Sequence, residues 1–228
     1  MSIRILRPLG DFSTMNTTQR SRPSLGIALV ASVKATVATA TALFLTSIPS
    51  ASASVFNLPH FTPPGHFGIG LEPELTFGDN SNAGFNLRYT HGLNELNNLN
   101  AFFGTGGDAR QFRIGGAYTF DFFPDVPNQP GIGLALQGLF VKRFDVGTIE
   151  LTLIPYLHKT LSSNQQVFEP FLAVPIGLTL AEGRYQYIST LSIGSLFHHN
   201  EHFSSVIELG VKLNNVDTYI SGGVIYYN

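Results

Sequence analysis

Two groups of residues in the sequence have types and spacing that suit chemistry, and both centre on histidine. His198, His199, Glu201 and His202 lie close together in the chain, and imidazole and carboxylate groups are ligands that zinc accepts. Adjacent histidines in one turn rarely converge on a single ion, so exposed polar residues of a turn are the favoured interpretation. We therefore predict no metal site.

The second group pairs a base with hydroxyl groups. His158 precedes Ser162 and Ser163, and a serine activated by a nearby histidine is the nucleophile of many hydrolases. Spacing along the chain is weak evidence for such a pair, because catalytic partners are recognised by their geometry in the fold. The chain also has no cysteine, which removes thiolate nucleophiles and thiolate metal ligands. No catalytic residue and no cofactor is predicted.

The composition is unusual for a soluble protein. Of 228 residues only 12% are charged, about half the share of an ordinary soluble domain. The formal net charge of −2 gives no electrostatic reason to expect a nucleic-acid partner. The chain is rich in glycine and phenylalanine, with 23 and 19 residues respectively, and lacks tryptophan.

The N-terminal 53 residues predict a cleaved secretory signal. An uncharged apolar run over 35–48 ends in small residues, with Ala51 and Ala53 at the positions that a signal peptidase reads. A short membrane anchor is the alternative, but the apolar run is too short to span comfortably. Met15 offers a possible true start. The basic residues that precede the apolar run are Arg4, Arg7, Arg20, Arg22 and Lys34.

The rest of the chain alternates in hydrophobicity with a period of two. After a proline-rich periplasmic lead-in at 54–65, residues such as Phe67, Ile69 and Leu71 alternate with small or polar ones. Successive side chains of a strand point to opposite faces, so each segment has one apolar face. Turn-forming residues separate ten such segments, and eight strands is the runner-up if 98–106 pairs poorly. The segments are 66–77, 83–92, 98–106, 110–122, 131–143, 147–158, 166–180, 184–197, 202–213 and 217–227.

The second face distinguishes a membrane barrel from a soluble one. It consists mainly of Gly, Ala, Thr, Ser, Asn and Gln, whereas a hydrated outer surface would be rich in charge. A signal sequence followed by ten alternating segments resembles the small outer-membrane β-barrels of Gram-negative bacteria. The resemblance covers 66–228 and implies an all-β, closed antiparallel transmembrane barrel in the cell outer membrane. It departs from that family in ending on Asn228 rather than on an aromatic residue.

Alternation and the implied topology assign the charged residues to two places. One set lies on the lumen side and forms either a charged gate or pairs that fill a narrow barrel: Glu72, Glu74, Arg88, Arg113, Glu150, Glu169 and Glu208. The other set lies near the outer rim. These cations either bind lipopolysaccharide phosphates or are ordinary polar residues at strand ends: Arg110, Lys142, Arg143, Arg184 and Lys212.

The sequence favours a non-enzymatic outer-membrane barrel, structural or forming a very narrow pore with a lumen filled by side chains. Two alternatives stay open: a barrel enzyme acting on lipid or peptide, and a secreted soluble barrel that binds an apolar ligand. The implied partners are outer-membrane lipid, lipopolysaccharide and the barrel assembly machinery. The sequence does not determine the oligomeric state.

Overall fold

The computed structural model describes residues 62–78, 81–107, 110–163 and 166–228. The predicted signal at 1–53, with Met15, and most of the lead-in at 54–65 lie outside the described residues. Within the described ranges, no helix has the length and apolar character needed to cross a membrane.

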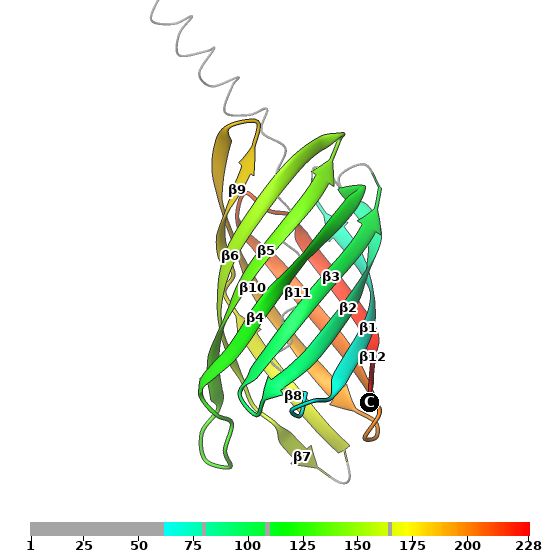
Figure 1. Ribbon diagram of the computed structural model, residues 1–228, viewed down its shortest axis with the longest axis vertical. Coiled ribbons are helices and arrows are strands. Elements are labelled where there is room, and N and C mark those ends of the chain that lie inside the picture. The colour runs from blue at the N-terminus through cyan, green and yellow to red at the C-terminus, as the bar shows by residue number, and fades with distance from the viewer. Residues whose placement is uncertain (1–61, 79–80, 108–109, 164–165) are drawn as a thin grey trace, which may run out of the picture. The chain divides into compact units, whose positions relative to one another are not determined.

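The described chain folds into strands that form one closed antiparallel barrel (Figure 1). Its wall has ten strands. The short β7 extends β6, since both pair with β8. β8 and β9 together form one interrupted strand, since both pair with β6 and β10. The elements are β1 Phe67–Phe77, β2 Asn82–Asn94, β3 Asn97–Gly106, β4 Phe112–Phe123, β5 Gly131–Arg143, β6 Val146–His158, β7 Leu161–Ser163, β8 Gln166–Ala173, β9 Ile176–Ala181, β10 Arg184–His198, β11 Phe203–Asn214 and β12 Thr218–Tyr227.

Ten strands were predicted, and ten form the wall. The segment at 98–106, on which the alternative of eight depended, is β3, which pairs along its length with β2 and β4. The segment at 166–180 is interrupted between Ala173 and Ile176. Pro175 lies in this gap, and a proline has no N–H to donate to the ladder.

Hydrogen bonds between β1 and β12 close the barrel, with Gly68 opposite Tyr227 and Phe77 opposite Thr218. Closure pairs the first and last strands of the described barrel with each other, which is what a wall surrounded by hydrocarbon requires. Both chain ends of the barrel lie at the same mouth, which we call the terminal end; the opposite mouth is the far end (Figure 1).

Two of the turns at the far end have only two residues. Phe144 and Asp145 connect β5 to β6, and both have positive φ angles, 43° and 68°. Glu182 and Gly183 connect β9 to β10 in the same way, with φ of 49° and 74°. Two central residues with positive φ match the right-handed twist of the flanking strands. These tight hairpins keep the far end of the wall compact.

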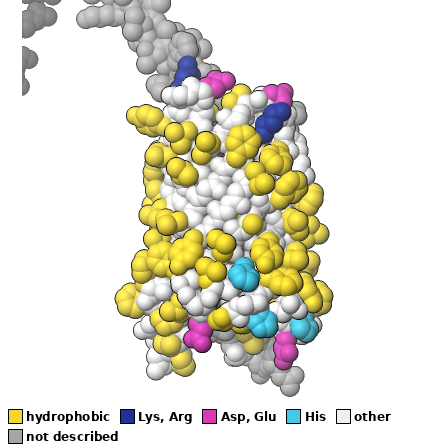
Figure 2. Space-filling view, in the orientation of Figure 1, with side chains coloured by type: hydrophobic (Ala, Val, Ile, Leu, Met, Phe, Trp, Pro, Cys, Tyr) yellow, Lys and Arg dark blue, Asp and Glu magenta, His cyan; other side chains and the backbone are white. Residues whose placement is uncertain are grey.

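The two faces of the wall differ as the alternation predicts. Many large apolar side chains are exposed on the outer surface, and on the face in Figure 2 the charged and histidine side chains lie toward the two ends. Leu71, Leu87 and Leu151 are examples of exposed outward residues on successive parts of the wall. The interior combines buried polar residues with apolar clusters, one of which consists of Ala135, Ile154, Tyr156, Ala173 and Tyr219.

Candidate functional site

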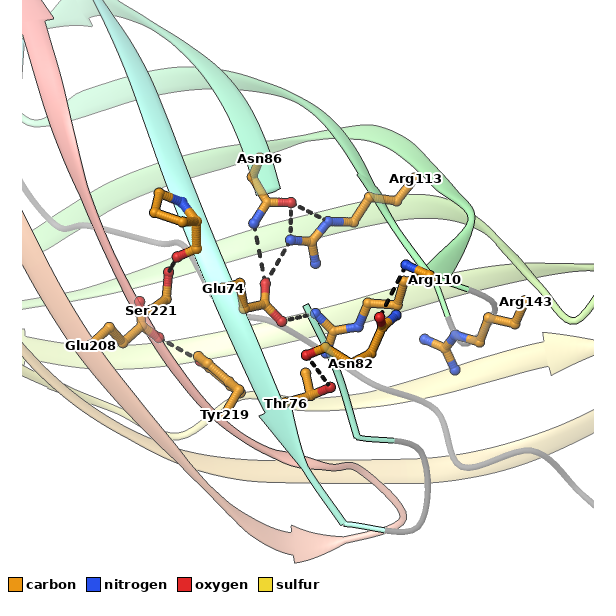
Figure 3. Close-up of polar contacts among 12 residues, drawn as sticks. Glu74, Thr76, Asn82, Asn86, Arg110, Arg113, Arg143, Glu208, Tyr219 and Ser221 are labelled. Carbon is orange, nitrogen blue, oxygen red and sulfur yellow. Dashed lines mark hydrogen bonds and ion pairs between the residues drawn. The ribbon is translucent and has the colours of Figure 1, made fainter. Parts of the chain in front are cut away.

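The interior of the barrel holds two networks of charged side chains. The network nearer the far end is built from β1, β2, β4 and the segment before β4 (Figure 3). Glu74 lies at its centre: Arg110 pairs with one carboxylate oxygen, and Arg113 Nη2 lies 2.8 Å from the other. Asn86 donates to Glu74 over 3.1 Å and accepts from Arg113 Nε over 2.6 Å. One carboxylate thus binds two guanidinium groups.

Two further buried ion pairs adjoin this centre. Arg88 pairs with Glu72, and Arg143 pairs with Glu150. Glu208 accepts hydrogen bonds from Ser192 and from Tyr219, whose hydroxyl lies 2.5 Å away. Burial of these charges is favourable only when each has a partner and hydrogen bonds. In the far-end network, arginines are the partners of Glu72, Glu74 and Glu150.

Glycines on neighbouring strands make room for these large side chains. A Cβ atom on Gly104 would overlap Arg113 and Asn86, and a Cβ on Gly210 would overlap the ring of Tyr219. The small residues of the inner face therefore leave space that the large side chains fill. Side chains occupy the lumen here, whereas a barrel with many more strands has an open channel.

The second network lies toward the terminal end and surrounds His158. Its Nε2 is 2.9 Å from Asp121 and its Nδ1 is 2.7 Å from Glu169. A neutral imidazole has one N–H, so only the protonated ring donates to both carboxylates. Tyr156 donates its hydroxyl to Asp121 over 2.8 Å, and His198 Nε2 lies 3.6 Å from Glu169.

Part of this network has a serine, a histidine and a carboxylate in line, as in the catalytic triad of a serine hydrolase. Ser204 Oγ lies 3.0 Å from His198 Nδ1, and the other nitrogen of that ring faces Glu169. Ser204 is only 1% exposed, however, and it belongs to the inner face of β11. A nucleophile has to reach its substrate, and this burial argues against catalysis at Ser204.

The seven residues predicted on the lumen side are all buried in the structure, and six of them belong to the two networks through side-chain contacts described above; Glu208 contacts Ser192 and Tyr219. They come from six strands, and their places are Glu72 and Glu74 on β1, Arg88 on β2, Arg113 on β4, Glu150 on β6, Glu169 on β8 and Glu208 on β11.

Two of the five cations predicted at the outer rim lie elsewhere, and this part of the prediction is corrected. Arg110 and Arg143 are only 7% and 2% exposed, and both turn into the lumen to pair with Glu74 and Glu150. An arginine near a strand end is long enough to fold back into the barrel mouth, where a buried carboxylate attracts it. Arg184 and Lys212 are exposed, and Lys142 is partly exposed and paired to Asp145.

Sequence reasoning missed Asp121, His158 and Tyr156 as lumen residues that act together. Alternation predicts which side chains of a single strand face the lumen: Tyr156 and His158 share the parity of Glu150 on β6. Their joining depends on strand register: Gly131 lies opposite His158, and Gly133 lies opposite both Asp121 and Tyr156. Only glycine at these two positions leaves space for the neighbouring side chains.

The two groups of residues first considered for chemistry do not assemble. Ser162 and Ser163 are exposed, whereas His158 points into the lumen. The histidines at 198, 199 and 202 contact Ser204, Ser205 and the backbone of Tyr227 respectively. Among the described residues, no three His, Cys, Asp or Glu side chains are placed to hold a metal ion.

An ion pair outside the strands anchors a loop at the terminal end. Lys159 Nζ lies 2.5 Å from Asp125, in the connection between β4 and β5, and the backbone N–H of Thr160 donates to the same carboxylate over 2.6 Å. Partial burial alone would raise the pKa of Asp125, but these hydrogen bonds outweigh it and hold the pKa below its ordinary value.

No family model and no curated protein matches the chain. Solved structures with similarity include an outer membrane channel from Pseudomonas putida F1, with 8% identity over 78% of this chain and 100% of that one, at a TM-score of 0.45. A chain from the de novo design of transmembrane β-barrels has 9% identity over 74% and 100%, at 0.39. Ail, the attachment invasion locus protein of Yersinia pestis, has 14% identity over 72% and 99%, at 0.28.

Scores this low carry no argument about function, so the assignment depends on the barrel itself. Its ten-strand wall is closed, its outer surface is covered by large apolar side chains, and its buried charges are paired inside. A closed wall with a large apolar outer face is suited to surrounding hydrocarbon. In water, an apolar surface of this extent would be unfavourably exposed. The described chain has the closed wall and the apolar outer face of a small transmembrane β-barrel.

Proposed function

We propose that this protein is a non-enzymatic barrel of the outer membrane whose lumen is closed to solutes, so that it serves a structural role or passes at most water and small ions. The observation that carries the proposal is an apolar cluster of side chains buried inside the barrel. Ile154 and Tyr219 are fully buried there and pack with Ala135, Tyr156 and Ala173.

Two other apolar clusters support the same conclusion. Phe102, Ala117, Leu139 and Val141 fill one part of the interior, and Phe171, Leu196, Val206 and Ile225 fill another. Barrels of about eight strands have interiors just wide enough to be filled by side chains, whereas open aqueous channels come with sixteen or more. Ten strands with three apolar clusters leave little room for a continuous water column.

Absence of catalysis is part of the proposal. Ser204 is the one serine that the described contacts place in line with a histidine and a carboxylate, and it is buried in the wall's inner face. A lipid or peptide substrate approaching from the membrane or from either mouth would have to displace packed side chains to reach it.

The proposed location and partners follow from the surface. The apolar wall suits outer-membrane lipid, and Lys142, Arg184 and Lys212 at the far end suit lipopolysaccharide phosphates. This orientation places the terminal end in the periplasm, where the barrel assembly machinery would meet β12 during insertion. Export through the signal at 1–53 belongs to the same proposal.

Planar-bilayer recordings of the purified folded protein test the closed lumen, with heat-modifiable gel mobility as the check on folding. The wild type is expected to give no steady porin-scale channels. Ile154→Ala removes an inward side chain and should raise the leak, whereas the adjacent outward change Leu153→Ala should not. Large, steady wild-type channels would refute the closed lumen.

A further inference from the structure

Glu208 is a fully buried carboxyl group on the inner face of β11. Among the described residues its hydrogen-bond partners are two hydroxyl groups, from Ser192 on β10 and Tyr219 on β12, and both contact Oε1 (Figure 3 shows the tyrosine contact). Its Oε2 is buried without a hydrogen-bond partner in this part of the chain. A hydroxyl group can accept a hydrogen bond as well as donate one, so these partners suit a neutral carboxyl group as well as a carboxylate.

The other acidic side chains buried at the far end have arginine partners. Glu72, Glu74 and Glu150 each pair with at least one arginine. Asp217, in the turn between β11 and β12, is attracted by a buried arginine as well. By contrast, the described residues form no ion pair to Glu208. This carboxyl group therefore differs from its acidic neighbours in lacking a paired cation within the structure described.

The charges buried at the far end do not balance if every group is ionised. Five acids face four arginines in the described ranges: Glu72, Glu74, Glu150, Glu208 and Asp217 against Arg88, Arg110, Arg113 and Arg143. One negative charge would thus be left over among side chains that are all buried. A buried charge without a partner is so costly that the group takes up a proton instead. Glu208 is the member of this set without an ion pair, so the surplus falls on it.

The charged groups around Glu208 leave this conclusion unchanged. The titratable or charged side chains that act on it from the surrounding strands are Tyr219 on β12, Glu72 on β1, Arg88 on β2 and Arg113 on β4. β10 contributes Ser192, which does not titrate, and a tyrosine hydroxyl titrates only near about pH 10. Both arginines attract Glu208, but each is already paired, one with Glu72 and the other with Glu74.

We propose that Glu208 is an uncharged carboxylic acid in the folded protein at neutral pH, and thus a proton-binding site inside the lumen. The proton removes the surplus charge and preserves the contacts with both hydroxyl groups. Its release leaves a negative charge that Glu72 repels, in contact with Tyr219, which packs in the apolar cluster with Ile154. Alkaline pH therefore weakens the packing of the lumen. This assignment does not depend on whether the barrel conducts, so it stands or falls separately from the proposed function.

Infrared spectroscopy of the folded protein at pH 7 tests the protonation state, in an alkyl glycoside detergent, which has no carbonyl group. A protonated carboxyl group absorbs above the amide I band, where carboxylates do not. Wild type should show this band, and Glu208→Gln should lack it. Glu150→Gln removes a carboxylate that is paired with arginine and, as the matched control, should keep the band.

A wild-type spectrum without the band, or a band that survives in Glu208→Gln, would overturn the proposal. Heat-modifiable mobility establishes that each variant is folded. Glu208→Asp, which keeps a carboxyl group in a different position, should shift the band, and it decides the assignment if Glu208→Gln does not fold. An unshifted band in Glu208→Asp would then show that another group holds the proton.

Urea unfolding at several pH values gives a second readout. The unfolded chain releases the Glu208 proton near about pH 4, whereas the folded protein keeps it at neutral pH. The folded state then binds more protons, so rising pH favours unfolding, by up to about tenfold per pH unit in the unfolding constant. The urea midpoint of Glu208→Gln relative to wild type should therefore rise between acid and neutral pH. That of Glu150→Gln should fall, because its carboxylate is paired in the folded state. A flat or falling relative midpoint for Glu208→Gln would show that Glu208 is charged.

Discussion

Arg88 pairs with Glu72 diagonally across the β1–β2 hairpin, because the residue directly opposite Arg88 is Gly70. Asn86 occupies the position opposite Glu72. The glycine leaves the arginine free to reach along the lumen toward the carboxylate, and the guanidinium also lies 5.9 Å from the ring centroid of Phe102. The pair therefore fills the lumen across three strands.

Removing this arginine should loosen the lumen. Arg88→Ala deletes a long buried side chain and leaves Glu72 without its cation, so we expect a higher ion leak in planar bilayers than in wild type. The leak should favour cations, since the buried acids Glu72, Glu74, Asp121, Glu150, Glu169, Glu208 and Asp217 outnumber the buried arginines Arg88, Arg110, Arg113 and Arg143. Reversal potentials in a salt gradient measure this, and anion selectivity would contradict it.

Glu74 should be among the most sensitive positions for stability. Glu74→Gln leaves two buried guanidinium groups without their shared carboxylate, and breaking a buried pair costs about 3–5 kcal/mol. Urea unfolding measures the loss. Asp145→Asn breaks the exposed pair with Lys142 and should change the unfolding midpoint little. Equal effects of the two changes would contradict the central role assigned to Glu74.

The loss of stability caused by a charge on the outer face should depend on its depth in the bilayer. Leu151 is exposed near the middle of β6, and an arginine at the bilayer midplane costs ~2–4 kcal/mol. Tyr185, 78% exposed at the far end, is the matched control because the same change there lies near the interface. Unfolding free energies in lipid vesicles should fall far more for Leu151→Arg than for Tyr185→Arg. Similar losses would mean that the wall does not face hydrocarbon.

Gly210 and Tyr219 should show strong coupling. Gly210→Ala places a methyl group against the Tyr219 ring, and overpacking of this kind costs about 1–3 kcal/mol. In a Tyr219→Ala background the same change should cost almost nothing, because the obstructing ring is gone. A double-mutant cycle of unfolding free energies measures the coupling. Additive effects would show that Tyr219 does not occupy this space.

The Asp125–Lys159 pair should make stability depend on acid pH. The pKa of Asp125 is lowered in the folded state, so its contribution is present above the unfolded value, about 4, and is lost as pH falls through the folded value. Asp125→Asn should therefore destabilise by about 1 kcal/mol at pH 7 and have little effect near pH 2. A difference that grows as the pH falls would contradict this sign.

The sequence by itself determined the wall. A period of two assigns each side chain to one of two faces, so the lumen positions of Glu72, Glu150 and Glu208 follow from parity alone. The turn residues between alternating segments set the number of strands, because each hairpin needs residues that tolerate its backbone angles. Both are local properties of the chain, so they can be predicted from the sequence.

Only the tertiary structure decided which lumen residues meet. Asp121, His158 and Glu169 lie on β4, β6 and β8, and strand register with barrel curvature brings them together. Arg143 has the inner-face parity of β5, whereas Arg110 lies outside the strands, where parity gives no information; both side chains turn inward, to Glu150 and Glu74 respectively. The physical reason is that contacts such as those of Asp121 with His158 and of Arg110 with Glu74 join segments distant in sequence, and the register and closure of the sheet set their distances.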